Sequence, residues 1–215
     1  MTQSPLARLA GPSALLAGIL IIAAQLGMYV SFAGSDRLET LSNPIFLPSM
    51  VTYFIGFCVL LIALVAIYET EAHRAGVFGL IGFIAAMLGT TFLAGNHWFD
   101  TFAGPWIADA APQLLSGQIQ HPVLTTAAFA SYVVFAVGWV LFGIASLRAG
   151  VFPALISIAI VVGGVAGFLA LSAPYGIPLG VAITMLGAWM IRSTSISARR
   201  RGQATSDANP SATRP

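Results

Sequence analysis

The sequence predicts an all-α fold, a polytopic membrane bundle of about six transmembrane helices. Charged residues make up 7% of the 215 positions and apolar residues 58%, whereas a soluble domain carries about 25% charged residues. Six charge-free stretches are long enough to cross a bilayer core of about 30 Å. Most arginines also fall on one side of the resulting arrangement, as membrane topology requires.

The six predicted spans occupy residues 13–33, 50–68, 76–95, 123–147, 151–172 and 175–191. Prolines separate the spans or occupy their first turns, where a missing backbone N–H costs little; they are Pro122, Pro153, Pro174 and Pro178. The first stretch could instead be a secretory signal. Its long apolar run and its single leading arginine, Arg8, favour an uncleaved helix. We therefore expect a transmembrane domain over residues 1–195.

The arginines predict the orientation, because basic residues are retained on the cytoplasmic side. Counting alternate segments places only Arg37 on the outward side, and the remaining arginines on the other: Arg8, Arg74, Arg148, Arg192, Arg199, Arg200, Arg201 and Arg214. Both termini are thus predicted to be cytoplasmic, in the inner membrane of a bacterium. The segments 36–39 and 96–121 are predicted to face outward.

A short repeat suggests internal duplication. The pentapeptide Arg-Ala-Gly-Val-Phe occurs at residues 74–78 and again at 148–152, a spacing of 74 residues. At the same spacing Gly89 corresponds to Gly163, so helices two and three would repeat as helices four and five in the same orientation. The alternative is two unrelated short turns, each with an arginine that reaches the headgroups.

Small residues recur at spacings of three and four in the later spans. They are Gly79, Gly82, Ala86 and Gly89 in the third, Ala159, Gly163 and Gly167 in the fifth, and Gly176 and Gly180 near the sixth. Such stripes let helix backbones approach closely. We interpret them as packing faces within the chain, with a homodimer interface or a lipid-sized groove as alternatives.

The spans contain hydroxyl and amide groups but no ionisable side chain of the kind that marks ion paths. This argues against proton-coupled transport. Ser and Thr hydroxyls in helices commonly donate to their own helix carbonyls. The single cysteine, Cys58, lies in an apolar run and is predicted to be a buried packing residue rather than a nucleophile.

The outward segment 96–121 is the most informative candidate site. Trp98, Phe102 and Trp106 recur at helical spacing, which suggests ligand-binding aromatic residues on two short interfacial helices broken at Gly104 and Pro105. The simpler interpretation is an aromatic belt at the membrane surface.

His97, Asp100 and His121 lie in or beside the same segment. Two imidazoles and one carboxylate would suit zinc or iron with open coordination positions, provided that the two histidines lie close together. Histidines at helix ends more often hydrogen-bond to carbonyls or water. No motif in the sequence specifies a cofactor.

The last residues, 196–215, are predicted to form a disordered basic cytoplasmic tail. Arg199, Arg200 and Arg201 lie close to the end of the sixth span and would contact anionic lipids.

The glycine-rich runs 137–145 and 74–83, with the segment 147–153, resemble uncharacterised bacterial multi-spanning integral membrane proteins of about six helices. The resemblance implies a membrane bundle but no activity.

Three functions follow as hypotheses. The first is binding or permeation of a lipid or small hydrophobic molecule beneath the segment 96–121. The second is an accessory or scaffold subunit of a membrane complex, in which a second copy or another subunit would be the partner. The third is an enzyme that uses His97, Asp100, Asp109 and His121 as metal ligands or as general acid and base. The net charge of +2 is too small to suggest a nucleic-acid partner.

Overall fold

The computed structural model describes residues 5–32, 37–115, 122–169 and 173–207, and of residues 196–207 the backbone only. The described chain is helical, without strands in these ranges. Its elements are α1 (Pro5–Ser31), α2 (Arg37–Ser42), α3 (Phe46–Ala110), the 3₁₀ turn η1 (Pro112–Leu114), α4 (Pro122–Ala149), α5 (Ala154–Gly167) and α6 (Ile177–Asp207). Four of them, α1, α3, α4 and α6, are long and apolar enough to cross a membrane.

Helix α3 consists of two arms that fold back on each other at Gly76. This glycine has φ 59° and ψ −157°, outside the helical region. Ring contacts join the arms, because Tyr68 stacks on Phe83 at 4.3 Å and Phe54 meets Phe102 edge-on at 6.4 Å. The first arm, residues 46–75, and the second arm, residues 77–110, are therefore antiparallel neighbours.

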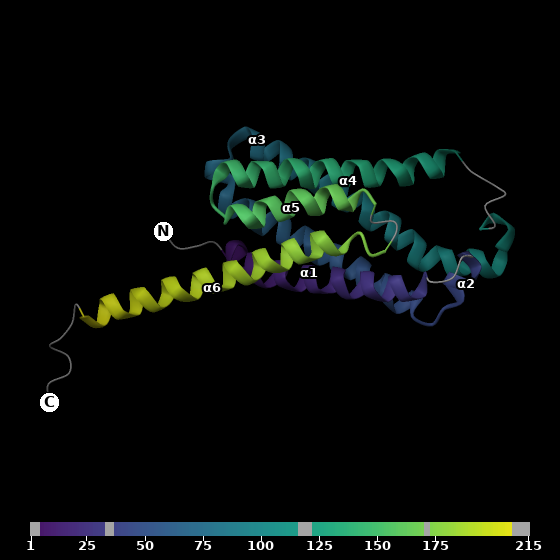
Figure 1. Ribbon diagram of the computed structural model, residues 1–215, viewed down its shortest axis with the longest axis horizontal. Helices are drawn as coiled ribbons and strands as arrows, with labels where there is room; N and C mark the ends of the chain where they lie inside the picture. The colour runs from purple at the N-terminus through teal and green to yellow at the C-terminus, as the bar shows by residue number, and fades with distance from the viewer. Residues whose placement is uncertain (1–4, 33–36, 116–121, 170–172, 208–215) are drawn as a thin grey trace, which may run out of the picture.

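The helical segments form a closed ring. Helix α1 packs against α3 and α6, and α4 packs against α3 and α5, while α5 also contacts α6. Figure 1 shows these helices side by side, with α6 running on beyond the bundle. Aromatic residues fill the interior: Tyr53, Phe57, Phe135, Trp139 and Phe142 are all at most 2% exposed. Much of the outer surface is apolar as well, which is compatible with membrane insertion.

Glycines set the close approaches within the ring. A β-carbon added to Gly138 of α4 would lie 2.5 Å from the Ala85 backbone of α3, and one on Gly163 of α5 would lie 2.6 Å from the Leu179 α-carbon of α6. Gly82 and Gly89 also lie against the backbone of α4. The small-residue stripes of the third and fifth predicted spans therefore pack within the chain.

The two ends of the bundle differ. We call the end that carries Gly76 and Gly150 the turn end, and the end that carries α2, residues 96–110 and η1 the loop end. Gly76 and Gly150, the third residues of the two repeated pentapeptides, have φ values of 59° and 62° and are the residues with positive φ in the described chain. Arg8, Arg74 and Arg148 lie at the turn end, and Arg37 lies at the loop end.

Several sequence-based expectations differ from the structure. Helix α3 continues through Gly104 and Pro105 to Ala110, where we predicted a break between two interfacial helices; Gly104 has no β-carbon to clash with the proline ring and lies against Leu41 of α2. Helix α5 has 14 residues, about 21 Å at the helical rise, and so is shorter than the predicted fifth span.

Further differences concern Cys58 and the tail. The Cys58 side chain is exposed, so the prediction of a buried residue was wrong: it lies on the outer face of the first arm. Helix α6 continues to Asp207, where disorder was predicted from residue 196. The prediction that helix hydroxyls satisfy helix carbonyls is confirmed for five of the residues concerned, Thr52, Thr90, Thr91, Ser131 and Thr184.

Candidate functional site

Two adjoining cavities lie at the loop end. The first, of about 380 Å³, is lined by residues of α1, α2, α3 and α4 and of the turns after α1 and before α6: Met28, Phe32, Arg37, Phe46, Met50, His97, Asp100, Tyr132 and Ala173. The second, of about 530 Å³, is lined mainly by α3, α4 and the end of α5: Arg37, Asn96, Phe99, Asp100, Leu124, Thr125, Ala128, Phe129, Tyr132, Phe168 and Leu169. We call them the inner and the lateral cavity and, together, the loop-end site.

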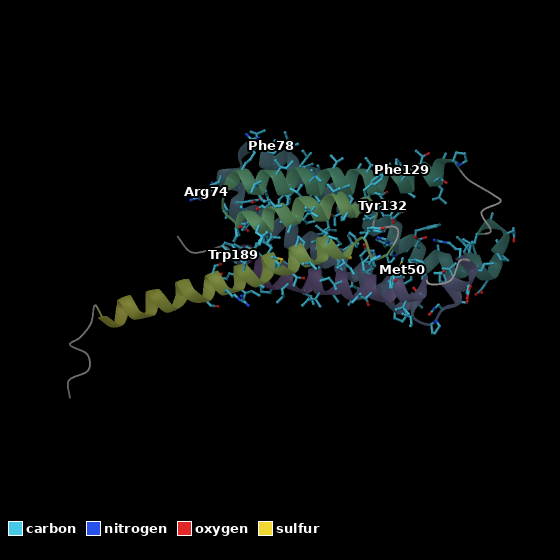
Figure 2. All side chains as sticks on the ribbon, viewed as in Figure 1. Met50, Arg74, Phe78, Phe129, Tyr132 and Trp189 are labelled. Atoms are coloured by element: carbon cyan, nitrogen blue, oxygen red, sulfur yellow. The ribbon has the colours of Figure 1, made fainter. Side chains whose placement is uncertain are left out.

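Three residues line both cavities: Arg37, Asp100 and Tyr132. The Arg37 guanidinium donates to Asp100 Oδ1 at 2.8 Å, and the two side chains are 41% and 26% exposed. This ion pair ties α2 to α3. Figure 2 labels Met50 of the inner cavity, Phe129 of the lateral cavity and Tyr132 of both, all toward the loop end.

His97 lies in the wall of the inner cavity with 2% of its surface exposed. Its ring packs against those of Tyr53 and Phe57, at centroid distances of 4.4 and 5.3 Å, and these two rings also contact each other at 4.8 Å. Neither ring nitrogen has a hydrogen-bond partner. Burial in apolar surroundings disfavours the charged form of an imidazole. The imidazole is therefore neutral, with one donor and one acceptor unused.

A buried amide fixes the backbone beside this site. Gln25 of α1 is buried, and its Oε1 accepts a hydrogen bond from the Gly176 N–H at 3.3 Å. A β-carbon on Gly176 would lie 2.7 Å from Gln25 Nε2 and 2.9 Å from the Tyr53 hydroxyl. This approach brings α1, the first arm and the start of α6 together, and a larger residue at position 176 would displace the ends of the Gln25 and Tyr53 side chains.

The aromatic residues proposed as ligand contacts lie elsewhere. Trp98, Phe102 and Trp106 are 52%, 50% and 69% exposed, respectively. They form a stripe on the outer face of the second arm and line neither cavity of the loop-end site. This position is typical of an interfacial aromatic belt.

The proposed metal ligands are brought together in part. His97 and Asp100 line the same cavity, but Asp100 is paired with Arg37. His121 lies outside the described residues, and Asp109 is exposed. Within the described ranges, no group of three or more metal-binding side chains is found, so the metal site remains a prediction.

A buried carboxyl group at the turn end was not anticipated. Glu71 is 1% exposed, and its Oε1 accepts a hydrogen bond from Ser146 of α4 at 2.9 Å. Burial raises the pKa of Glu71 to about 7, although the bond from Ser146 opposes this. The pairing joins residues 75 positions apart, so no local pattern in the sequence indicates it.

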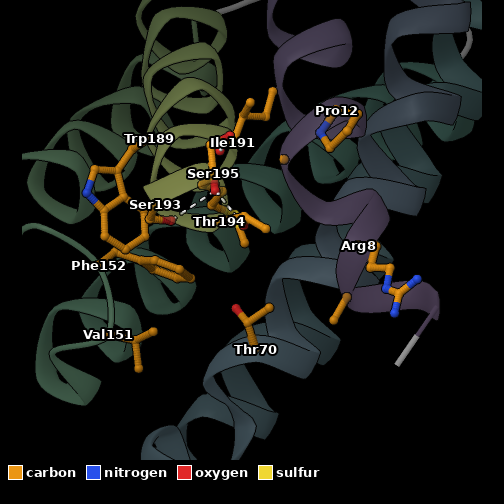
Figure 3. A pocket seen from close by; sticks show the side chains of 13 residues that line it. Arg8, Pro12, Thr70, Val151, Phe152, Trp189, Ile191, Ser193, Thr194 and Ser195 are labelled. Carbon is orange, nitrogen blue, oxygen red and sulfur yellow. Dashed lines mark hydrogen bonds between the residues drawn. The ribbon is translucent and has the colours of Figure 1, made fainter. Parts of the chain in front are cut away.

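A further cavity of about 460 Å³ lies at the turn end, lined by residues of α1, α3 and α6 and by Val151 and Phe152 of the turn before α5 (Figure 3). Phe152 meets Trp189 edge-on at 5.8 Å on one wall, and Arg8 supplies the charge. The hydroxyls of Ser193, Thr194 and Ser195 donate to carbonyls of their own helix. The side chains of Arg199, Arg200 and Arg201 are not described, so their predicted lipid contact is untested.

Comparison of the chain with protein-family models, with curated proteins and with solved structures finds no match. The function is therefore argued from the geometry of the site.

Proposed function

We propose that this chain is an integral membrane protein of a bacterial inner membrane that binds a lipid or another small hydrophobic molecule in the loop-end site. It would cross the bilayer six times, with the turn end and both termini in the cytoplasm. Arg8, Arg74 and Arg148 at the turn end, against Arg37 at the loop end, support this orientation.

The observation that carries the proposal is that two cavities share Arg37, Asp100 and Tyr132 in their walls and differ in the rest of their lining. The ion pair of Arg37 and Asp100 lines both cavities; the inner cavity adds His97, whereas the lateral cavity adds the apolar side chains of Leu124, Phe129 and Phe168. Their volumes, about 380 and 530 Å³, fall in the range of small-molecule sites. Such a site suits an amphipathic molecule whose polar end lies in the inner cavity and whose apolar end lies in the lateral cavity, with Tyr132 between them.

The lateral cavity also offers a route from the bilayer. Phe129, Phe168 and Leu169 line it and are 58%, 41% and 50% exposed. Phe129 and Phe168 meet edge-on at 5.7 Å across the gap between α4 and α5. A hydrophobic chain could enter here from the lipid without crossing water.

The alternatives have less support. The glycine stripes pack inside the ring, so they leave fewer close-packing faces for a partner subunit. An enzyme that uses His97 and Asp100 would need a further group, and Asp100 already pairs with Arg37.

A cavity-filling substitution tests the proposal. Ala128 lines the lateral cavity, so Ala128→Trp should occupy the space of the ligand. Protein extracted in a mild detergent would be analysed by native mass spectrometry. We expect a bound lipid-sized molecule on the unmodified chain and a loss of about tenfold in occupancy in Ala128→Trp, equivalent to about 1.4 kcal/mol.

Ala130→Trp is the matched control, because Ala130 is exposed on the same helix and lines neither cavity of the loop-end site. It should retain the bound molecule. Equal occupancy in all three proteins, or an unmodified chain that carries nothing, would contradict the proposal.

A further inference from the structure

The unpartnered imidazole of His97 points to the chemistry of the head group that the loop-end site selects. We propose that His97 recognises an uncharged lipid head group that carries a hydroxyl, in preference to an anionic phospholipid head. This inference rests on the proposed function and specifies the class of ligand.

The first argument is the missing hydrogen bonds. Both ring nitrogens of His97 are buried without a partner, although buried polar groups are nearly always paired. A buried polar group without a partner costs about 1–3 kcal/mol. His97 lines the inner cavity, and a ligand hydroxyl that reached its ring could donate to one nitrogen or accept from the other.

The second argument is the charge balance of the cavity wall. Among the described residues that line either cavity, Arg37 is the one cationic residue, and it is bonded to Asp100 at 2.8 Å. A phosphate head would meet the Asp100 carboxylate as well as the guanidinium, and an ammonium head would meet Arg37. An uncharged head leaves the ion pair intact.

The third argument is that the imidazole is held in place. Tyr53 and Phe57 contact the His97 ring at tilts of 49° and 35°, and these residues come from the opposite arm of α3. The ring nitrogens are themselves covered, so a head group reaches them by displacing a neighbouring side chain. Met28 and Met50 line the same cavity, and methionine adapts its shape at low cost.

Two lipids with the same acyl chains provide the test. Delipidated protein would be titrated with 1,2-dioleoylglycerol, whose head is a hydroxyl, and with dioleoylphosphatidic acid, whose head is a phosphate, and binding would be followed by native mass spectrometry. We expect the unmodified chain to bind the diacylglycerol at least about tenfold more tightly.

His97→Phe keeps an aromatic ring packed against Tyr53 and Phe57 but removes both nitrogens. It should lower diacylglycerol affinity about tenfold, leave phosphatidic acid binding unchanged, and unfold at the same or a higher temperature, since an unpaired polar group is removed. His97→Gln, which retains a donor and an acceptor, should restore part of the preference. A residue with only a packing role would not change head-group selectivity in this way.

The outcomes separate the two proposals. Suppose first that both lipids bind to the unmodified chain and that Ala128→Trp abolishes their binding. If the unmodified chain then shows no preference between the lipids, or if His97→Phe has the same affinities as the unmodified chain, the role of His97 is overturned while the binding site stands. If neither lipid binds differently to the unmodified chain and to Ala128→Trp, the proposed function fails and the inference fails with it.

Discussion

The two ends of the bundle differ in how the chain connects its helices. At the turn end, two copies of one pentapeptide make short reversals around Gly76 and Gly150, whose φ values differ by 3° (59° and 62°). At the loop end, α3 runs on to Ala110, α2 packs beside it, and two cavities open between the helices. The turn end therefore connects the helices by short turns, and the loop end contains the candidate site.

The two reversals are alike in backbone and in surroundings. A β-carbon on either Gly76 or Gly150 would meet nothing within 4 Å, so the backbone conformation, and not space, requires glycine. Thirteen residues further on, Gly89 and Gly163 each lie against the backbone of the following helix. These matches support the predicted duplication, which remains a prediction for the helices as a whole.

The largest expected effect on stability is at Gly89, where the second arm of α3 packs against α4. Gly89→Leu forces a side chain into the Phe135 backbone and should destabilise the protein by about 3 kcal/mol or more, which would appear as loss of monodisperse protein in detergent. Gly95→Leu is the control, because nothing lies within 4 Å of a β-carbon there. Similar yields of the two variants would contradict this packing.

Glu71 provides a pH-dependent comparison. Its pKa rises from 4.5 to about 7 in the folded chain, so the stability contributed by the protonated carboxyl is complete below pH 4.5 and is lost as pH rises through about 7. Glu71→Gln should therefore raise the unfolding temperature by a few degrees at pH 8 and have little effect at pH 5. Glu39→Gln, on the exposed surface of α2, is the control and should leave the unfolding temperature unchanged at both pH values. A shift of equal size at pH 5 and pH 8 for Glu71→Gln would exclude titration as the cause.

A smaller effect should test whether the two reversals are equivalent. Gly76→Ala and Gly150→Ala each place a β-carbon at positive φ and should cost about 1–2 kcal/mol. The costs should agree within about 0.5 kcal/mol. Thermal unfolding in detergent measures both. A large cost at only one position would show that the turns are not equivalent.

The smallest effect is expected for the aromatic stripe on the outer face of the second arm. Trp106 is 69% exposed and lines neither cavity of the loop-end site, so Trp106→Ala should leave ligand occupancy unchanged by native mass spectrometry. A loss as large as that of Ala128→Trp would move the site from the cavities to the outer face.

Local features of the sequence predicted most of the helices. Apolar length and proline position placed α1, α4 and α6, and the repeated pentapeptide placed both turns. The exception was α5, because Pro153 sets its start and the chain turns after Gly167, so that composition alone overestimated its length.

The candidate site was predicted only in outline, since it depends on contacts between distant residues. The sequence indicated residues 96–121 but favoured the tryptophans, because a helical period does not say which face points inward. His97 lies inside because the first arm supplies Tyr53 and Phe57 around it. Arg37 could have indicated the site, because it was the one arginine predicted on the outward side. In the structure it pairs with Asp100, 63 residues away.

The central claim is that the loop-end site holds a hydrophobic molecule, and a density map of the protein in lipid nanodiscs tests it most directly. Electron cryomicroscopy with a bound antibody fragment would supply the map. We predict elongated density that passes Tyr132, with its polar end at His97 and its apolar end at Phe129. Cavities closed by side chains, or occupied by water alone, would contradict the account.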